Sequence, residues 1–385
     1  MDLNDLAEPV AIERPAEKDL KDGIALCLSG GGYRAMLFHL GAIWRLNQAG
    51  YLSKLDRVSS VSGGSITAGT LAMVWSELRF GVDGVATNLE DQLVSRVRGL
   101  AGRTVDAGAV IAGILTPGSV SSKVASRYDR HLFHGTTLQN LPTDEAGPRF
   151  VINATNLQTG VLWRFSRPYM ADYKMGSVDL PDVLLATAVA ASSAFPPALS
   201  PTILEIDPGM FDPKSKRWEL AHLQATGQAV LSDGGVYDNL GLETAWKRYR
   251  TILVSDGGGE LSVENTVKTD WARQSLRVLK VIDNQVRSMR KRQVIEAFKR
   301  GHRRGAYWGI RSDQPGYGLA DPLPADPEMV GRLAEIKTRL KKLGSGDQER
   351  LINWGYVICD TALRTWVDRG LDRPIAIPYP SSPIG

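Results

Sequence analysis

The sequence predicts an α/β protein in which a mostly parallel central sheet is flanked by helices and followed by a helical C-terminal part. Two observations predict this fold. Short apolar runs that end in glycines are followed by segments with helical spacing of apolar residues, in 23–50 and again in 54–80. The 385-residue chain is also 43% hydrophobic and 23% charged, which is near the globular average. Because strand, glycine turn and helix recur in this order, we expect parallel strands.

The first two units can be read residue by residue. "GIALCLS" (23–29) is a short apolar run with a glycine stop, which is typical of a buried strand. "RAMLFHLGAIWRLNQAG" (34–50) then has helical periodicity and a terminal glycine that suits a helix C-cap. "KLDRVSSVS" (54–62) and "ITAGTLAMVWSELRF" (66–80) repeat the pattern as strand and helix.

The rest of the chain contains further strands and helices. Segment 81–147 is less regular and is helical in parts, with a Pro-Gly break at 117–118. Residues 149–166 have the pattern of a hairpin around "LQTG". The remaining expected elements are a helix over 180–195, strands over 229–235 and 250–259 with a helix over 239–249 between them, a helical and basic stretch from 270, and a last helix over 347–367.

Charge and apolar patterning suggest where the protein works. The polar N-terminus does not resemble a signal peptide, and no apolar run approaches the roughly 18 residues of a membrane span. The two cysteines, Cys27 and Cys359, lie in apolar runs, which fits buried thiols in a reducing compartment. We expect a cytoplasmic protein, possibly peripheral to the inner face of the membrane.

The stretch "VSSVSGGSITAG" (58–69) contains two serines that half-fit the nucleophile elbow G-x-S-x-G. Ser62 has a glycine only after it, and Ser65 has one only before it. An elbow needs its serine between the strand end and the first helical turn. The apolar helix pattern begins at Ile66, so Ser65 is favoured. A plain strand-to-helix turn without chemistry remains the alternative.

A second glycine-rich turn, "SGGGYRA" (29–35), also joins a strand to a helix. Three consecutive glycines can direct their N–H groups into one concave nest that binds an anion. No Lys-Ser/Thr pair follows, so the turn is not a P-loop. An oxyanion hole formed by Gly30 to Gly32 fits better, with Arg34 orienting the loop or attracting an anionic headgroup.

The general base is less obvious from the residues. None of the histidines lies in a triad context, and His39 sits within an apolar helix pattern that is typical of a core residue. Asp233, in "LSDGGVYDN", ends an apolar strand and could act as the base if burial raises its pKa. Asp256, in "VSDGGG", is its rival on chemistry alone.

These blocks together resemble the patatin-like phospholipase family, bacterial type. "GGGYRA" (30–35) matches the family's oxyanion loop, "GGSIT" (63–67) its elbow and "SDGGVYDN" (232–239) its Asp-Gly box. "ASSAFPP" (191–197) resembles a further small-residue block that ends in proline. Two departures are visible: Ala35 and Thr67 stand where many members have glycine.

The resemblance implies a three-layer α/β/α fold and a lipid acyl hydrolase that cleaves (glycero)phospholipid esters with a Ser–Asp dyad. It favours Asp233 over Asp256, because "YDN" follows Asp233. It implies no cofactor and no metal. It also implies a leader over 1–22, a catalytic domain over 23–310 and a helical extension over 311–385 packed on the same domain. The implied site consists of Ser65 as nucleophile, Asp233 as base, the amides of Gly30, Gly31, Gly32 and Ile66 as oxyanion hole, and Arg34 as orienting residue.

The stretch 287–304 has eight Lys/Arg and one acid, Glu296. A solvated helix face is one interpretation. The other is transient contact with an anionic membrane surface. That contact would use Arg287, Arg290, Lys291 and Arg292. A nucleic-acid partner is not expected, because no aromatic interleaving or binding motif accompanies the charge.

Two alternative functions stay open. The first is a patatin-like effector of bacterial anti-phage defence whose phospholipase activity a cyclic nucleotide switches on, with 81–147 or the basic stretch as sensor or homo-oligomer contact. The second is a non-catalytic lipid-binding protein on the same fold.

Overall fold

The computed structural model describes residues 20–105, 119–215 and 221–385. Most of the expected leader and the Pro-Gly break at 117–118 lie outside these residues. Five neighbouring strands in the order β10-β9-β1-β2-β3 are all paired in parallel, which confirms the predicted parallel centre. These strands are β1 (Lys21–Leu28), β2 (Leu55–Val61), β3 (Arg149–Asn156), β9 (Tyr249–Asp256) and β10 (Arg304–Gly309).

Beyond β3 the sheet is antiparallel. The hairpin predicted over 149–166 is confirmed, because β3 pairs antiparallel with the next strand. The strand predicted over 229–235 is also present, and it too runs antiparallel to β3. The strands of this flank are β4 (Val161–Phe165), β5 (Tyr169–Asp172), β6 (Gly176–Asp179), β7 (Thr202–Glu205) and β8 (Gln228–Asp233).

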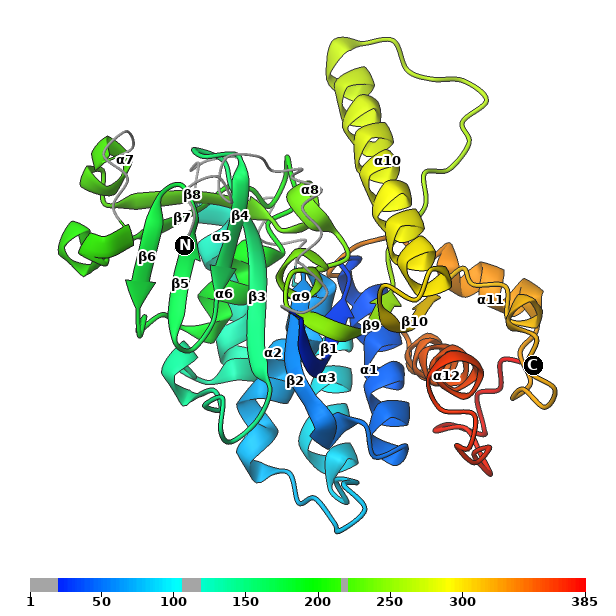
Figure 1. Cartoon of the computed structure of the whole chain (residues 1–385). Helices are drawn as coiled ribbons and strands as arrows, with labels where there is room; N and C mark the ends of the chain where they lie inside the picture. The colour runs from blue at the N-terminus through cyan, green and yellow to red at the C-terminus, as the bar shows by residue number, and fades with distance from the viewer. Residues whose placement is uncertain (1–19, 106–118, 216–220) are drawn as a thin grey trace.

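Helices cover both faces of the sheet (Figure 1). The irregular region 81–147 contains two described α-helices, as its partly helical pattern predicted. The α-helices are α1 (Gly32–Gln48), α2 (Gly63–Val74), α3 (Ser95–Ala101), α5 (Ser119–Tyr128), α6 (Leu185–Ser192), α7 (Ala221–Ala225), α8 (Gly235–Asp238), α9 (Glu243–Trp246), α10 (Trp271–Lys299), α11 (Pro327–Ala334) and α12 (Ser345–Ala362).

Two apolar clusters lie on opposite faces of the sheet. The larger contains the inward side chains of α1, α2, α6 and α12. The smaller joins Cys27 and Ile252 of the sheet to Leu242 beside α9 and to Val294 near the end of α10. The protein therefore has three layers, as the resemblance implied.

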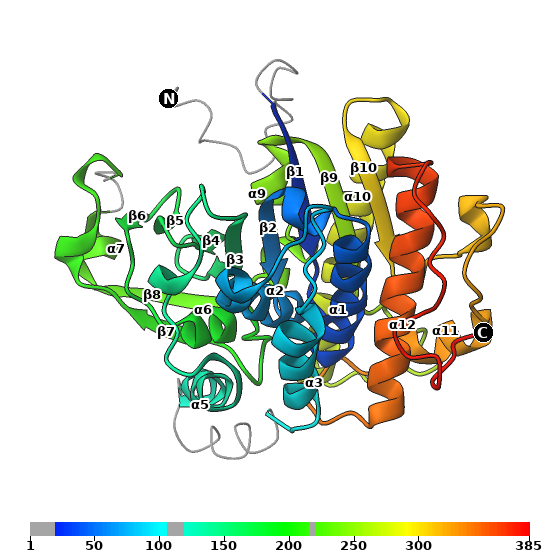
Figure 2. The same ribbon diagram turned by 90° about the horizontal axis from the view of Figure 1, so that it is seen from below.

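The C-terminal helix α12 lies alongside α1 (Figure 2). Glycines permit the close approach, since a methyl group at Gly41 would come within 1.9 Å of the Ile352 carbonyl oxygen. A methyl group at Gly355 would come within 1.8 Å of the Phe38 carbonyl oxygen. A buried ion pair between Arg45 of α1 and Asp360 of α12, at 2.8 Å, joins the same two helices.

The start of α2 differs from the sequence prediction. The apolar pattern placed the helix from Ile66, but α2 already begins at Gly63. Gly63 and Gly64 carry no apolar side chain, so periodicity does not register them as helical. As a result Ser62 is the residue between strand and helix, and Ser65 lies within the first helical turn.

Candidate active site

Three strand ends meet at one place in the sheet. β1 ends at the glycine loop, β2 ends at the elbow and β8 ends at Asp233. The backbones touch there, because a methyl group at Gly63 would lie 2.1 Å from the Gly32 carbonyl oxygen. A methyl group at Gly30 would lie 3.2 Å from the Ser62 β-carbon. The glycine loop and the elbow therefore form one continuous surface.

Ser62 occupies the tip of the elbow with unusual backbone angles. Its φ is 51° and its ψ is −119°. A positive φ is costly for a residue with a β-carbon, and such strain is characteristic of functional turns, including the nucleophile elbow. The turn leaves Ser62 8% exposed, whereas Ser65 is fully buried.

Asp233 lies against Ser62. The Ser62 hydroxyl lies close enough to the Asp233 carboxylate to lower its pKa as a hydrogen-bond donor, and the Gly235 N–H donates to the same carboxylate at 2.7 Å. Asp233 is buried, and this burial raises its pKa to about 7, although the hydrogen bonds from Gly235 and Ser62 act in the opposite direction. A carboxyl group with such a pKa can accept a proton near neutral pH.

Ser65 has different partners. Its hydroxyl donates to the Ser60 hydroxyl at 3.0 Å and lies 2.9 Å from the Ser192 hydroxyl. Within the described residues, no hydrogen bond joins Ser65 to Asp233. The structure therefore does not bring together the serine and the aspartate that the sequence paired. The reason is the early start of α2, which turns Ser65 inward.

The block "ASSAFPP" holds both Ser62 and Asp233 in place. The Ser192 hydroxyl accepts the Ser62 N–H at 2.9 Å and donates to the Asn153 carbonyl at 2.7 Å. The Ala194 carbonyl accepts the Asp233 N–H at 2.9 Å. Neither Ser192 nor Asn153 was expected at the site. The small-residue block was the only signal in the sequence for Ser192, and nothing there indicated Asn153.

The N–H groups expected to form the oxyanion hole fall into two sets. The Gly30 N–H donates to the Asn239 carbonyl at 3.0 Å, and the Ile66 N–H donates to the Ser62 carbonyl at 3.3 Å. Both are therefore engaged within the protein. Among the described residues, no acceptor takes the N–H of Gly31, Gly32 or Gly63. Gly32 has a φ of +62°, which disfavours any larger residue.

Arg34 joins the start of α1 to two distant segments of the chain, and its printed hydrogen bonds do not reach the glycine loop 30–32 that it was expected to orient. It is 3% exposed, and its Nε donates to the Gly257 carbonyl at 3.1 Å. Its other nitrogens donate to the Ile336 carbonyl and to the Thr338 hydroxyl. With its nitrogens held by the protein, Arg34 is not available to an anionic headgroup.

The other candidates have structural surroundings. His39 is buried between the Ser255 hydroxyl at 2.8 Å and the Ser29 carbonyl at 2.9 Å, and burial lowers its pKa to about 4. Asp256 accepts from the Tyr307 hydroxyl at 2.7 Å and from the Gly258 N–H at 2.9 Å. Burial would raise the pKa of Asp256, but Arg287 and these donors bring it below its usual value.

The basic stretch mostly faces the protein. Arg290 pairs with Glu243 at 3.2 Å, and Lys291 lies 4.9 Å from the centre of the Tyr307 ring. Arg287 approaches Gly258, and its charge acts on Asp256. Arg292 donates to the Ser288 carbonyl of its own helix. Three of the four cations expected at a membrane are thus directed toward protein groups.

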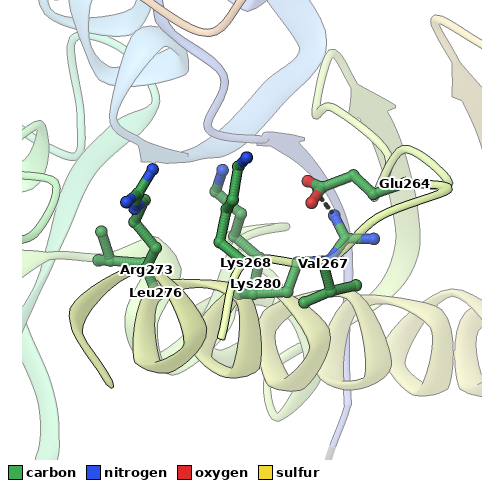
Figure 3. Close-up of a pocket in the computed structure, with 7 residues that line it drawn as sticks. Glu264, Val267, Lys268, Arg273, Leu276 and Lys280 are labelled. Atoms are coloured by element: carbon green, nitrogen blue, oxygen red, sulfur yellow. Dashed lines mark hydrogen bonds and ion pairs between the residues drawn. The ribbon is translucent and has the colours of Figure 1, made fainter. Parts of the chain in front are cut away.

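A hollow lies between α10 and the segment before it (Figure 3). It contains none of the expected site residues. Glu264 pairs there with Arg277 at 3.0 Å, and Arg273 and Lys280 extend from the same side of α10, while Lys268 belongs to the segment before it. Its lining consists of Glu264, Val267, Lys268, Arg273, Leu276, Arg277 and Lys280.

The described residues contain neither a group of metal ligands nor a membrane-spanning helix. Across 20–105, 119–215 and 221–385, no three His, Cys, Asp or Glu side chains are grouped as metal ligands would be. In the same residues no helix combines the length and the apolar character that a membrane span requires.

Comparison with known proteins identifies the family. The patatin-like phospholipase model matches residues 26–246, more than half of the chain. The chain therefore belongs to the patatin-like phospholipase family. No curated protein matches it.

Solved structures with detectable similarity are distant. Human GIVD cytosolic phospholipase A2 is 12% identical, with a TM-score of 0.47. The same human enzyme with methyl gamma-linolenyl fluorophosphonate and terbium chloride is 13% identical, with a TM-score of 0.49. VipD from Legionella pneumophila is 16% identical, with a TM-score of 0.33. Each match covers 88% of this chain but only 61%, 57% and 66% of the respective known chain.

Proposed function

We propose that this protein hydrolyses ester bonds of glycerophospholipids, with Ser62 as nucleophile and Asp233 as its base. One observation carries the proposal: a serine with a strained backbone lies beside a buried carboxyl group whose pKa is raised to about 7 and on which the serine hydroxyl acts as a hydrogen-bond donor. Three N–H groups without an acceptor in the described residues, those of Gly31, Gly32 and Gly63, adjoin this pair. Family membership supplies the class of substrate.

The proposed reaction follows the arrangement of these groups. The Asp233 carboxylate takes the proton of the Ser62 hydroxyl as its oxygen attacks the ester carbonyl. The N–H groups of Gly31, Gly32 and Gly63 stabilise the resulting oxyanion. The intermediate collapses and the alcohol part leaves with the proton from Asp233. Water, deprotonated by Asp233, then attacks the acyl-serine, and the fatty acid is released.

Ser62 replaces Ser65 in this proposal, and the Gly63 amide replaces those of Gly30 and Ile66. Two contacts support the change. The Ser65 hydroxyl is engaged by Ser60 and Ser192, at 3.0 and 2.9 Å. The residue after the nucleophile contributes an amide to the hole in elbow sites, and Gly63 follows Ser62.

A fluorophosphonate probe distinguishes the two serines. Labelling followed by peptide fragmentation should place the adduct on Ser62, because only an activated serine attacks the probe. Ser62→Ala should lower esterase activity by roughly 10³-fold or more. Ser65→Ala is the matched control and should retain most of the activity and all of the labelling. An adduct on Ser65, with Ser62→Ala active, would contradict the assignment.

We further propose that α10 meets the surface of an anionic phospholipid membrane. The helix projects from the body of the protein (Figure 1), and Trp271 is 81% and Met289 64% exposed. Exposed apolar side chains recur along the projecting part at helical spacing, and cations lie on another side (Figure 3). The apolar residues are Trp271, Val278, Leu279, Ile282 and Met289.

Vesicle binding tests this surface. The double variant Val278→Asp/Ile282→Asp should bind phosphatidylglycerol vesicles roughly tenfold or more weakly, since two carboxylates oppose both burial and charge. Val82→Asp, at a fully exposed valine outside α10, should bind normally. All variants should hydrolyse a short soluble ester equally well. If light scattering shows a dimer that only the double variant loses, α10 binds a second copy and the membrane proposal fails.

The two alternative functions remain predictions with clear tests. Hydrolysis of vesicles by the purified protein without any nucleotide would contradict the switched effector. Fluorophosphonate labelling at either serine would contradict a non-catalytic lipid-binding protein. Lipid mass spectrometry of wild type against Ser62→Ala would identify the ester that is cut.

A further inference from the structure

Several arginines gather on the face of the sheet that carries α9. Arg57 lies on β2 and Arg164 on β4, and Arg248 follows α9. Arg57 shares its face of the sheet with Ser59, because side chains alternate along a strand. The Ser59 hydroxyl accepts from Thr244 of α9 at 2.8 Å, which identifies the face.

Arg57 is the most buried of these three arginines, and we call it the floor of the cluster. Its residue is 2% exposed, and its Nε and Nη1 have no hydrogen-bond partner among the described residues. Its guanidinium lies 5.5 Å from the centre of the Tyr249 ring, a contact with one face of the group. A buried cation with unsatisfied donors is strongly destabilising unless an anion compensates it.

The two neighbouring arginines, Arg164 and Arg248, bring no carboxylate that would balance the charge of Arg57. Arg164 lies over the Tyr169 ring at 5.7 Å, and Arg248 donates to the Thr244 carbonyl at 3.3 Å. No carboxylate in the described part of the chain pairs with Arg57, Arg164 or Arg248. Both rim arginines are half-buried, so each keeps part of its side chain in contact with solvent.

Electrostatic effects show that these charges act on one another. Burial lowers the pKa of Arg248, and the positive charge of Arg57 lowers it further. Burial would raise the pKa of Tyr169, but Arg164, Arg248 and Arg57 bring it below its ordinary value. The described residues thus gather positive charge around Tyr169, and the Asp144 carboxylate, which pairs with Arg149, is the neighbouring anion on which Arg57 also acts.

The floor of the cluster, Arg57, is distant from the ester site along its strand, whereas Arg164 is level with Val61 two strands away. Arg57 precedes Ser62 by five residues on one strand. At about 3.3 Å per residue, this corresponds to roughly 17 Å. The three charged guanidiniums also make the cluster unsuited to binding an apolar acyl chain.

We propose that this cluster is a phosphate-binding site, in which Arg57 forms the floor and Arg164 and Arg248 form the rim. A phosphate dianion balances several guanidiniums better than a single carboxylate does, and its oxygens accept charge-assisted hydrogen bonds from each. The group could belong to a free phosphorylated compound or to a lipid headgroup. The proposal is independent of the hydrolase activity.

Calorimetric titration with inorganic phosphate at constant ionic strength tests the site directly. Wild type should bind phosphate, and Arg164→Gln/Arg248→Gln should bind roughly tenfold or more weakly. Arg332→Gln, which removes an exposed arginine on α11, is the control and should bind as wild type does. Absence of binding in wild type, or equal binding in the double variant, would overturn the proposal.

A second variant distinguishes loss of phosphate binding from loss of folding. Arg57→Met keeps much of the volume and removes the buried charge. In phosphate-free buffer it should melt at or above the wild-type temperature, but phosphate should no longer raise its melting temperature. Wild-type-like stabilisation of Arg57→Met by phosphate would contradict the assigned floor.

Competition with inorganic phosphate distinguishes a free phosphorylated compound from a lipid headgroup as the ligand. Glycerol 3-phosphate should displace inorganic phosphate if the ligand is a free compound. If only phosphatidic acid vesicles displace it, and the double variant loses that effect, the site recognises a lipid headgroup. Ser62→Ala should bind phosphate normally in every arm, which separates this site from the hydrolase.

Discussion

At the residue scale, the site depends on strain at Ser62. Its φ of 51° is unfavourable for any residue with a β-carbon, at a cost of about 1–3 kcal/mol. The hydrogen bond from the Ser62 N–H to Ser192 and the contact of its side chain with Asp233 hold it there. The strained turn leaves Ser62 8% exposed, whereas Ser65 is fully buried.

This strain predicts a difference between two inactive variants. Ser62→Ala keeps a β-carbon at the strained position, whereas Ser62→Gly removes it. Ser62→Gly should therefore unfold with a free energy roughly 1 kcal/mol higher than that of Ser62→Ala. Denaturant titration of both proteins measures this difference. If Ser62→Gly is the less stable variant, the backbone strain is not significant.

The pKa of Asp233 predicts the pH dependence of catalysis. The base acts only as the carboxylate, and burial raises its pKa to about 7. The kcat/KM for a soluble ester should therefore rise tenfold per pH unit below about 7 and level off above it. A profile already flat from pH 5 would show that Asp233 is ionised there, which would remove the physical basis for its role as a base of matched pKa.

At the element scale, two helices begin at the site. α1 begins at Gly32 and α2 at Gly63, so both N-termini point their free N–H groups toward the same place. Only glycine allows the two turns to touch, since a methyl group at Gly63 would lie 2.1 Å from a backbone oxygen. Small residues here determine the geometry of the proposed oxyanion hole.

Gly63→Ala tests this contact. The added methyl group must displace the loop at Gly32, so we expect a loss of stability of about 2 kcal/mol and a fall in kcat of at least about tenfold. Gly99→Ala on α3 is the control, because a methyl group there would meet nothing within 4 Å. Thermal melting and ester hydrolysis measure both effects. An active, stable Gly63→Ala would show that the two turns are not tightly coupled.

At the scale of the whole molecule, α12 packs against α1 and so supports the helix that begins at the glycine loop. α1 carries the glycine loop at its start, and its other residues pack against α12. The Arg45–Asp360 pair is nearly inaccessible to solvent, so breaking it would leave an uncompensated buried charge. The last helix of the chain thus fixes the helix that supports the oxyanion loop.

Gly355→Ala tests the packing of the two helices. Its methyl group would lie 1.8 Å from the Phe38 carbonyl oxygen, so the helices must separate, and we expect a loss of about 2–3 kcal/mol. Gly331→Ala on α11 faces nothing within 4 Å and should gain up to about 1 kcal/mol from helix propensity. Chemical denaturation of both variants measures the contrast. Equal stabilities would show that α1 and α12 are not packed this closely.

Much of this organisation can be predicted from the sequence. Periodicity predicts β1, α1, β2 and α12, because each buries one face or all faces of a regular element. Glycine blocks mark the turns after β1 and β2, and the aspartate before a third marks the end of β8. The antiparallel pairing of β8 with β3 could not be predicted, since strand direction depends on partners that are distant in the chain.

The sequence by itself determined the three glycine-bearing strand ends and the residue types at them, because turn chemistry and periodicity are local properties. It did not determine which serine faces Asp233. Periodicity detects a helix from its apolar residues, so it missed that Gly63 and Gly64 are helical. Only the tertiary structure orients Ser62 toward Asp233 and buries that carboxyl group, because both depend on contacts between β2, β8 and α6.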